Sequence, residues 1–374
     1  MMILEKLTFG EFCFDVVLWL VFLVTNAQYL IPNSRCEMAY CRDKNYIPLF
    51  LFLLVFCTFD FIGGDFFHYL NLYKSNSSLN TNLSGQHLEA FYLWLIKVLP
   101  GNYFVWRFTV WGIASLLLVA TFKRFHLPAR ISALAFLLVI SVVFASFRNS
   151  LGFVTLFFGS TFLFSNKGSK FLNLLIFAGC LICSLFLHRS MFIFATLFCV
   201  ALIPIGKRTY LISVLLFPVL YRLIGGYAYQ ILGSSLVSED SAANGIGYLE
   251  SEFRVETTLM GYVQLALSRL PIYVILIYSI INIYFKRQVV SYSVKTYLNV
   301  TYFLVYISLL WRGQEVSAFL TNRFHDSAMF FCSVFLAMYM PTLPNSKVLR
   351  RCLIVLSVAS FYAFAYAFYK HKFL

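Results

Sequence analysis

Long runs of hydrophobic residues, separated by short polar segments, recur from one end of the chain to the other. The runs are about 17 to 25 residues long, the length that an α-helix needs to cross a hydrocarbon core roughly 30 Å thick. No alternation of period two accompanies them, which favours an all-helical bundle over a barrel. About twelve such runs are predicted, at 12–31, 46–62, 103–122, 131–147, 150–166, 171–187, 190–206, 209–230, 259–285, 296–312, 326–341 and 351–369.

The amino-acid composition indicates that these runs are membrane spans rather than core helices of a soluble protein. Of 374 residues, 61% are hydrophobic and only 12% are charged, and the mean hydropathy is +0.80. Those values lie far outside the balance of a soluble domain. Residues 1–374 are therefore predicted to form a single polytopic, all-α membrane domain. The N-terminus lacks the cationic region and cleavage site of a signal peptide, so the first span is expected to be retained.

Basic residues gather in the connections that follow the odd-numbered spans. These connections hold 16 of the 29 lysines and arginines but only two acids, Glu37 and Asp43, and so carry the whole net charge of +14. By the positive-inside rule they face the cytoplasm, and both termini lie outside. The basic residues are Arg35, Arg42, Lys44, Lys123, Arg124, Arg130, Lys167, Lys170, Lys207, Arg208, Lys286, Arg287, Lys295, Lys347, Arg350 and Arg351.

The opposite, outer side receives the long connections and the unusual polar residues. The stretch "SLFLHRSMFIF" places His188, Arg189 and Ser190 in a tight outer turn between two apolar runs. The segments 61–102, 231–258 and 313–325 are also predicted to be outer connections, and loops of such length are usually functional or disordered. If the chain has an active site, this pattern predicts that it lies at the outer face.

Eight arginines lie at the outer side or inside spans on this map. A guanidinium is planar, stays charged when partly buried and fits phosphate oxygens, so several on one face indicate an anionic ligand. Snorkelling to the membrane surface is the alternative for any single one. The eight are Arg107, Arg148, Arg189, Arg222, Arg254, Arg269, Arg312 and Arg323.

Of the eight arginines, Arg269 has the position with the highest expected free-energy cost in a bilayer. It lies ten residues into a span, roughly 15 Å deep, where an unpaired charge costs several kcal/mol. It is therefore expected to face a polar cavity or a partner such as Asp15.

Three side chains are candidates for moving a proton. His188 lies in the outer turn, and a histidine exchanges protons near neutral pH. Asp65 and Glu89 both belong to the 61–102 connection. Asp65 and His68 share a helical face, but without a third ligand they predict no metal site. No phosphate-binding glycine loop, zinc protease motif or nucleophile elbow is present, and no cofactor or nucleic-acid partner is expected.

An arginine-rich, aromatic outer cavity without a nucleotide site suits a substrate that carries its own activation. A sugar linked to a lipid pyrophosphate is such a substrate, because the pyrophosphate is the leaving group. Arginines would stabilise the charge that develops on it, and a base would accept the proton of the attacking hydroxyl.

Ordered landmarks along the chain resemble the EpsG-like branch of the Wzy-type O-antigen and exopolysaccharide polymerases. They are Gly64 and Asp65 with Tyr69, Glu89 before a short apolar segment, Arg148 in a tight outer turn, the triplet from His188 to Ser190, and Arg323 before the penultimate span. Ala90 stands where the family pattern has a proline after the glutamate.

The resemblance implies a multi-pass glycosyltransferase with a GT-C-like helical bundle in the bacterial inner membrane. Such an enzyme moves a growing glycan from undecaprenyl pyrophosphate onto a lipid-linked repeat unit at the periplasmic face, in some systems beside a flippase and a chain-length regulator. The implied catalytic residues are His188, Arg148, Asp65 and Glu89. The implied pyrophosphate-binding residues are Arg323, Arg189, Arg254, Arg269 and Arg312.

Two other classes remain open. A flippase for the same lipid-linked oligosaccharide also has about twelve spans, and is expected to place polar residues at mid-membrane in both halves. A membrane O-acyltransferase acting on sugars needs a route for a cytoplasmic acyl donor. The sequence reveals no second polar cluster near the inner face, which disfavours the acyltransferase.

Overall fold

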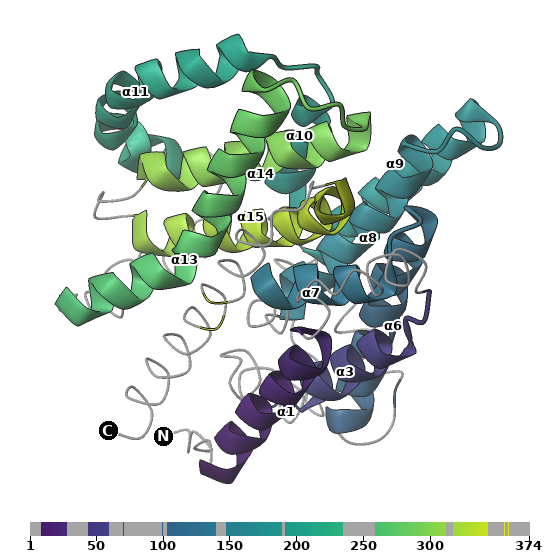
Figure 1. Cartoon of the computed structure of the whole chain (residues 1–374). Helices are drawn as coiled ribbons and strands as arrows, with labels where there is room; N and C mark the ends of the chain where they lie inside the picture. The colour runs from purple at the N-terminus through teal and green to yellow at the C-terminus, as the bar shows by residue number, and fades with distance from the viewer. Residues whose placement is uncertain are drawn as a thin grey trace. The chain divides into compact units, whose positions relative to one another are not determined.

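The computed structural model describes residues 9–27, 44–59, 70, 99, 103–139, 147–188, 191–234, 259–311, 317–342, 355 and 358. All regular structure within these residues is helical. The chain divides into two compact units, Met1–Thr196 with Ser333–Leu374, and Leu197–Cys332. Figure 1 labels the helices of both units, which are described one at a time below.

The first unit is built from helices that pack side by side along much of their length. The closest pairs are α8 with α9, α6 with α8, and α3 with α6. Its helices are α1 (Phe9–Ala27), α3 (Ile47–Thr58), α6 (Tyr103–Arg124), α7 (Ala129–Val139), α8 (Phe147–Leu163), α9 (Lys170–Leu187) and the first half of α10 (Met191–Ala201).

The second unit contains two helices with an internal proline. Pro218 and Pro271 lie inside them, where a proline removes one backbone donor. The helices of the second unit are α11 (Lys207–Ser234), α13 (Leu259–Ile280), the π-helix η5 (Ile281–Phe285) that continues α13, α14 (Tyr292–Trp311) and most of α15 (Ser317–Tyr339). A short 3₁₀ turn, η6 (Met340–Thr342), follows α15.

Two helices of the described part, α6 and α9, are long and apolar enough to cross a membrane. A soluble protein rarely exposes a contiguous apolar surface of the kind that α9 carries. Phe171 is 75% exposed, and Leu172, Leu175 and Phe186 are each more than half exposed. Length, apolar composition and outward-facing hydrophobic side chains together fit a membrane protein.

One predicted span and one predicted connection differ from the helices found. The predicted 190–206 span is helical only over α10, because Pro204 and Gly206 follow it and favour a turn. The predicted 131–147 span overlaps α7 (Ala129–Val139), and its residues 140–146 lie outside the described residues. The predicted outer connection 313–325 is wrong from residue 317 onward, since α15 already begins at Ser317. The predicted 351–369 span lies outside the described residues except for 355 and 358.

Helix directions in the first unit bring its basic residues to one end. The ring of Phe14 contacts that of Phe59, and Phe22 stacks on Phe52, so α1 and α3 are antiparallel. The Tyr46 hydroxyl, at the start of α3, donates to the carbonyl of Leu127, just after α6.

The remaining connections join the same end. Arg124 Nε, at the end of α6, donates to Thr161 Oγ1 near the end of α8 at 2.8 Å. The short 164–169 turn then leads into α9, which runs back along α8. We call this the basic end of the first unit; its cations are Lys44, Lys123, Arg124, Arg130, Lys167 and Lys170.

The second unit has a basic end of its own. The Tyr292 hydroxyl, at the start of α14, donates to the carbonyl of Leu202, just before α11. The cations here are Lys207, Arg208, Lys286, Arg287 and Lys295. Within each unit, the described cations of the predicted cytoplasmic connections therefore lie at one end.

Candidate functional site

The predicted polar triplet begins at a helix junction in the first unit. α9 ends at Leu187, and His188 follows in extended backbone (φ −161°, ψ 133°). The Met191 N–H, at the start of α10, donates to the His188 carbonyl at 3.0 Å. His188 is partly exposed and makes further interactions within the protein. The tight turn predicted from the sequence is thus present, while Arg189 and Ser190 lie outside the described residues.

Two glycines on α8 allow α9 and α10 to approach closely. A Cβ at Gly159 would lie 2.5 Å from the Cβ of Cys180, and one at Gly152 would lie 2.8 Å from Cγ of Met191. The same Cβ at Gly152 would be 3.5 Å from the carbonyl oxygen of Ser184. Side chains at both positions are therefore excluded by the packing of α8 against its neighbours.

This packing brings the positions of Arg148 and His188 to the same end of the helix pair. Arg148 is one turn before Gly152 on α8, and His188 is one turn after Ser184 on α9. Because Gly152 and Ser184 are in contact range, the two candidate positions lie on adjacent helix ends. The sequence separation of 40 residues gave no direct sign of this proximity. The side chain of Arg148 lies outside the described atoms.

Three helices also start at this end, which is opposite to the basic end of the first unit. They are α6, α8 and α10, beginning at Tyr103, Phe147 and Met191. The first N–H groups of a helix have no partner within the helix and carry a partial positive charge. The end therefore favours an anionic group even before side chains are considered. We call it the histidine end.

Arg107 belongs to the histidine end but is already engaged within the protein. Only 1% of its side chain is exposed. Its Nε donates to the Thr58 carbonyl at 3.0 Å, Nη2 donates to the Cys57 carbonyl, and Nη1 donates to the Tyr103 hydroxyl at 3.2 Å. Arg107 therefore caps the carbonyl groups at the end of α3, so its guanidinium serves the fold.

In the second unit, Arg269 is buried as the sequence predicted for a residue deep in a span. Its side chain is 3% exposed, and Tyr273, one turn further along α13, contacts the ring of His325 on α15 edge-to-face at 6.0 Å. His325 is also 3% exposed. Arg269 and His325 both make further interactions within the protein. Asp15, the suggested partner of Arg269, is fully buried in the first unit.

The remaining predicted residues are either on helices of the second unit or outside the described residues. Arg323 is on α15, two residues before His325, but its side chain is outside the described atoms. Arg222 is exposed on α11. Outside the described residues lie Asp65, Glu89, Arg254 and Arg312. Among the residues that are described, no group of three or more His, Cys, Asp or Glu side chains could hold a metal ion.

A network of tyrosines in the second unit was missed by the sequence analysis. Asn299 Oδ1 on α14 accepts hydrogen bonds from the hydroxyls of Tyr210 at 2.6 Å and Tyr284 at 2.8 Å. Ser213 shares a hydrogen bond with the Tyr302 hydroxyl, and its carbonyl accepts one from Tyr306 at 2.6 Å.

This network begins at the basic end of the second unit, since Tyr210 is three residues from Lys207. The sequence analysis did not identify this polar cluster. Tyrosine counts as hydrophobic in composition, so the cluster is visible only once α11, η5 and α14 are brought together.

Comparison with known proteins adds no relative: no family model, curated protein or solved structure matches this chain.

Proposed function

We propose that the chain is a membrane glycosyltransferase of the polysaccharide polymerase type. It would cross a bacterial inner membrane about twelve times as a GT-C-like bundle, with its active site at the periplasmic face. The substrate would be an oligosaccharide linked to undecaprenyl pyrophosphate. A flippase that delivers this lipid and a chain-length regulator are its candidate partners.

The observation that carries the proposal is the composition of the histidine end. The positions of Arg148 and His188 lie there beside three helix N-termini. This end is opposite to the basic end of the first unit. If the basic end faces the cytoplasm, the histidine end faces outward. An outward site with a cation, helix N-termini and a histidine suits a pyrophosphate leaving group and a proton acceptor.

The reaction assigns one role to each group. The hydroxyl oxygen of the acceptor sugar attacks C1 of the donor glycan, and its proton passes to the imidazole of His188. The bond between C1 and the phosphate oxygen breaks, and undecaprenyl pyrophosphate leaves with the negative charge. Arg148 stabilises that charge. Arg323, Arg189, Arg254, Arg269 and Arg312 are the pyrophosphate-binding residues that the family resemblance implies. Asp65 and Glu89 are the alternative bases.

Product size on a gel tests the proposal. Purified full-length protein is incubated with a synthetic undecaprenyl-pyrophosphate repeat unit, and the glycans are resolved by length. A ladder of oligomers is expected, reduced at least 100-fold in His188→Ala and Arg148→Ala. The matched controls are His126→Asn and Arg208→Ala, whose side chains are exposed at basic ends and whose ladders should be unchanged. An intact, correct repeat unit that yields no ladder would refute polymerisation.

A flippase for the same lipid is the second candidate, because of Arg269 and His325. Two basic side chains buried near the middle of α13 and α15 are what a transport path through the second unit would use. A fluorescent lipid-linked oligosaccharide in sealed vesicles distinguishes the two functions. Flipping that is lost in Arg269→Gln but kept in His188→Ala would favour the transporter.

A further inference from the structure

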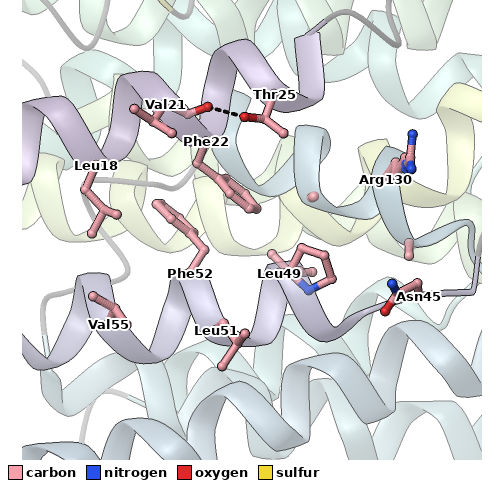
Figure 2. Close-up of a pocket in the computed structure, with 13 residues that line it drawn as sticks. Leu18, Val21, Phe22, Thr25, Asn45, Leu49, Leu51, Phe52, Val55 and Arg130 are labelled. Carbon is pink, nitrogen blue, oxygen red and sulfur yellow. Dashed lines mark hydrogen bonds between the residues drawn. The ribbon is translucent and has the colours of Figure 1, made fainter.

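A groove of about 360 Å³ opens between α1, α3 and α7 in the first unit. Figure 2 shows its walls, with α1 on one side, α3 on the other, and the rings of Phe22 and Phe52 facing each other in the middle. The two rings are stacked with centroids 3.9 Å apart. Val21 and Leu51, on opposite walls, are 59% and 51% exposed. The groove is therefore apolar and accessible from outside the protein.

Its polar groups are confined to one end. Thr25, Asn45 and Arg130 lie together at that end, whereas Leu18 and Val55 line the other (Figure 2). The polar end of the groove coincides with the basic end of the first unit.

Further positive charge surrounds the polar end. Lys123 Nζ lies 5.9 Å from the ring centroid of Tyr46, the residue next to Asn45 in the chain. Lys44 precedes Asn45 and is exposed. The acid nearest in sequence, Asp43, lies outside the described residues. The described cations at this end therefore favour an anionic group.

The groove has the direction and polarity of a membrane lipid. Between Leu18 and Thr25 its α1 wall rises roughly 10 Å, parallel to the helix axes. For a protein in a bilayer, cations at the helix ends lie at the level of lipid headgroups, and apolar walls below them lie at the level of acyl chains. Arg130 presents a guanidinium, which pairs with phosphate through two hydrogen bonds.

We propose that this groove binds an anionic phospholipid, with one acyl chain between Phe22 and Val55 and the phosphate against Arg130. The inference requires that the chain lies in a bilayer, but it does not depend on polymerase activity. A bound lipid would fix α1 against α3 and α7 at the inner membrane surface.

Native mass spectrometry of the purified full-length protein tests this directly. Protein exchanged into mixed vesicles of phosphatidylglycerol and phosphatidylcholine is released from them, and the retained lipid is identified by mass. We expect one phosphatidylglycerol per chain, retained at least five-fold over phosphatidylcholine. Arg130→Gln should lower that preference to less than two-fold, and Val21→Trp, which fills the groove, should abolish retention of either lipid.

Matched controls separate the groove from general effects. Lys170→Gln removes an exposed cation of the same end outside the groove, and Leu172→Trp places the same aromatic side chain on an exposed face of α9. Both should retain phosphatidylglycerol like the unmodified protein. Equal retention of the two lipids, retention that survives both groove variants, or a second protein chain in place of lipid would each overturn the proposal.

Discussion

Arg107 illustrates how a charged residue inside an apolar helix can serve the fold. Its guanidinium donates to two carbonyls at the end of α3, which would otherwise have no partner in a buried setting. Arg107→Ala is predicted to lower the free energy of unfolding by about 3 kcal/mol, since it leaves buried acceptors unsatisfied and a cavity. Thermal unfolding in detergent measures this. Arg222→Ala, an exposed arginine on α11, is the control and should change stability by less than about 0.5 kcal/mol.

The hydrogen bonds to Asn299 predict that Asn299→Leu lowers stability more than Tyr210→Phe does. Tyr210→Phe removes one donor, but Asn299 Oδ1 keeps its bond from Tyr284, so the expected loss is about 1 kcal/mol. Asn299→Leu leaves two phenol hydroxyls without their acceptor and should cost at least about 2 kcal/mol. Both are measured by thermal unfolding. Equal losses, or a larger loss for Tyr210→Phe, would contradict the shared-acceptor arrangement.

At the residue scale, the sequence predicted where a residue lies along a helix better than it predicted that residue's hydrogen-bond partners. The helix junction at His188 and the burial of Arg269 both follow from hydropathy alone, because the flanking runs set their depth. The contacts of Arg107 and the tyrosine network do not, since their partners are up to 93 residues away and include backbone carbonyls. Neither a carbonyl acceptor nor a helix pairing leaves a signal in composition.

At the element scale the close pair α8 and α9 gives a matched test of packing. Gly159→Ala places a Cβ 2.5 Å from Cys180 Cβ, which the two backbones can relieve only by moving apart. We expect a loss of about 1–3 kcal/mol. Gly179→Ala, where the new Cβ meets nothing within 4 Å, should be neutral or stabilising by up to about 1 kcal/mol.

The double variant Gly159→Ala with Cys180→Gly makes the same test sharper. It removes the Cβ that causes the clash, so it should recover part of the stability lost in Gly159→Ala. Thermal unfolding of the four proteins gives the coupling. Strict additivity of the two changes would show that the contact is not the source of the loss.

Helix positions were predictable because each follows from a long apolar run. The starts of α3, α6, α9 and α10 fall within one residue of the predicted spans. The helix boundaries were mispredicted where a polar segment is helical or an apolar segment is not. Arg323, His325 and Asp326 looked like a connection, yet the segment has no glycine or proline after Ser317, and α15 continues through it. Conversely, α10 stops before Pro204 although its surroundings are apolar.

At the scale of the whole molecule, the distribution of charge is the feature that connects fold and function. Within each unit the described loop cations lie at one end, and in the first unit the His188 and Arg148 positions are at the other. This separation could be predicted from the sequence because the positive-inside rule needs only the order of spans. The other residues of the site, beyond His188, Arg148 and the helix N-termini, could not be predicted from the sequence. Their positions depend on which connections, far apart in the sequence, come together in the fold.

Cysteine labelling in intact cells tests whether the histidine end faces outward. In a background without native cysteines, His188→Cys, Lys44→Cys and Lys167→Cys are each exposed to a membrane-impermeant maleimide, with and without permeabilisation. We expect the cysteine at 188 to be labelled in intact cells and those at 44 and 167 to be labelled only after permeabilisation. Labelling at 44 and 167 but not at 188 would place the candidate site in the cytoplasm and contradict a periplasmic polymerase.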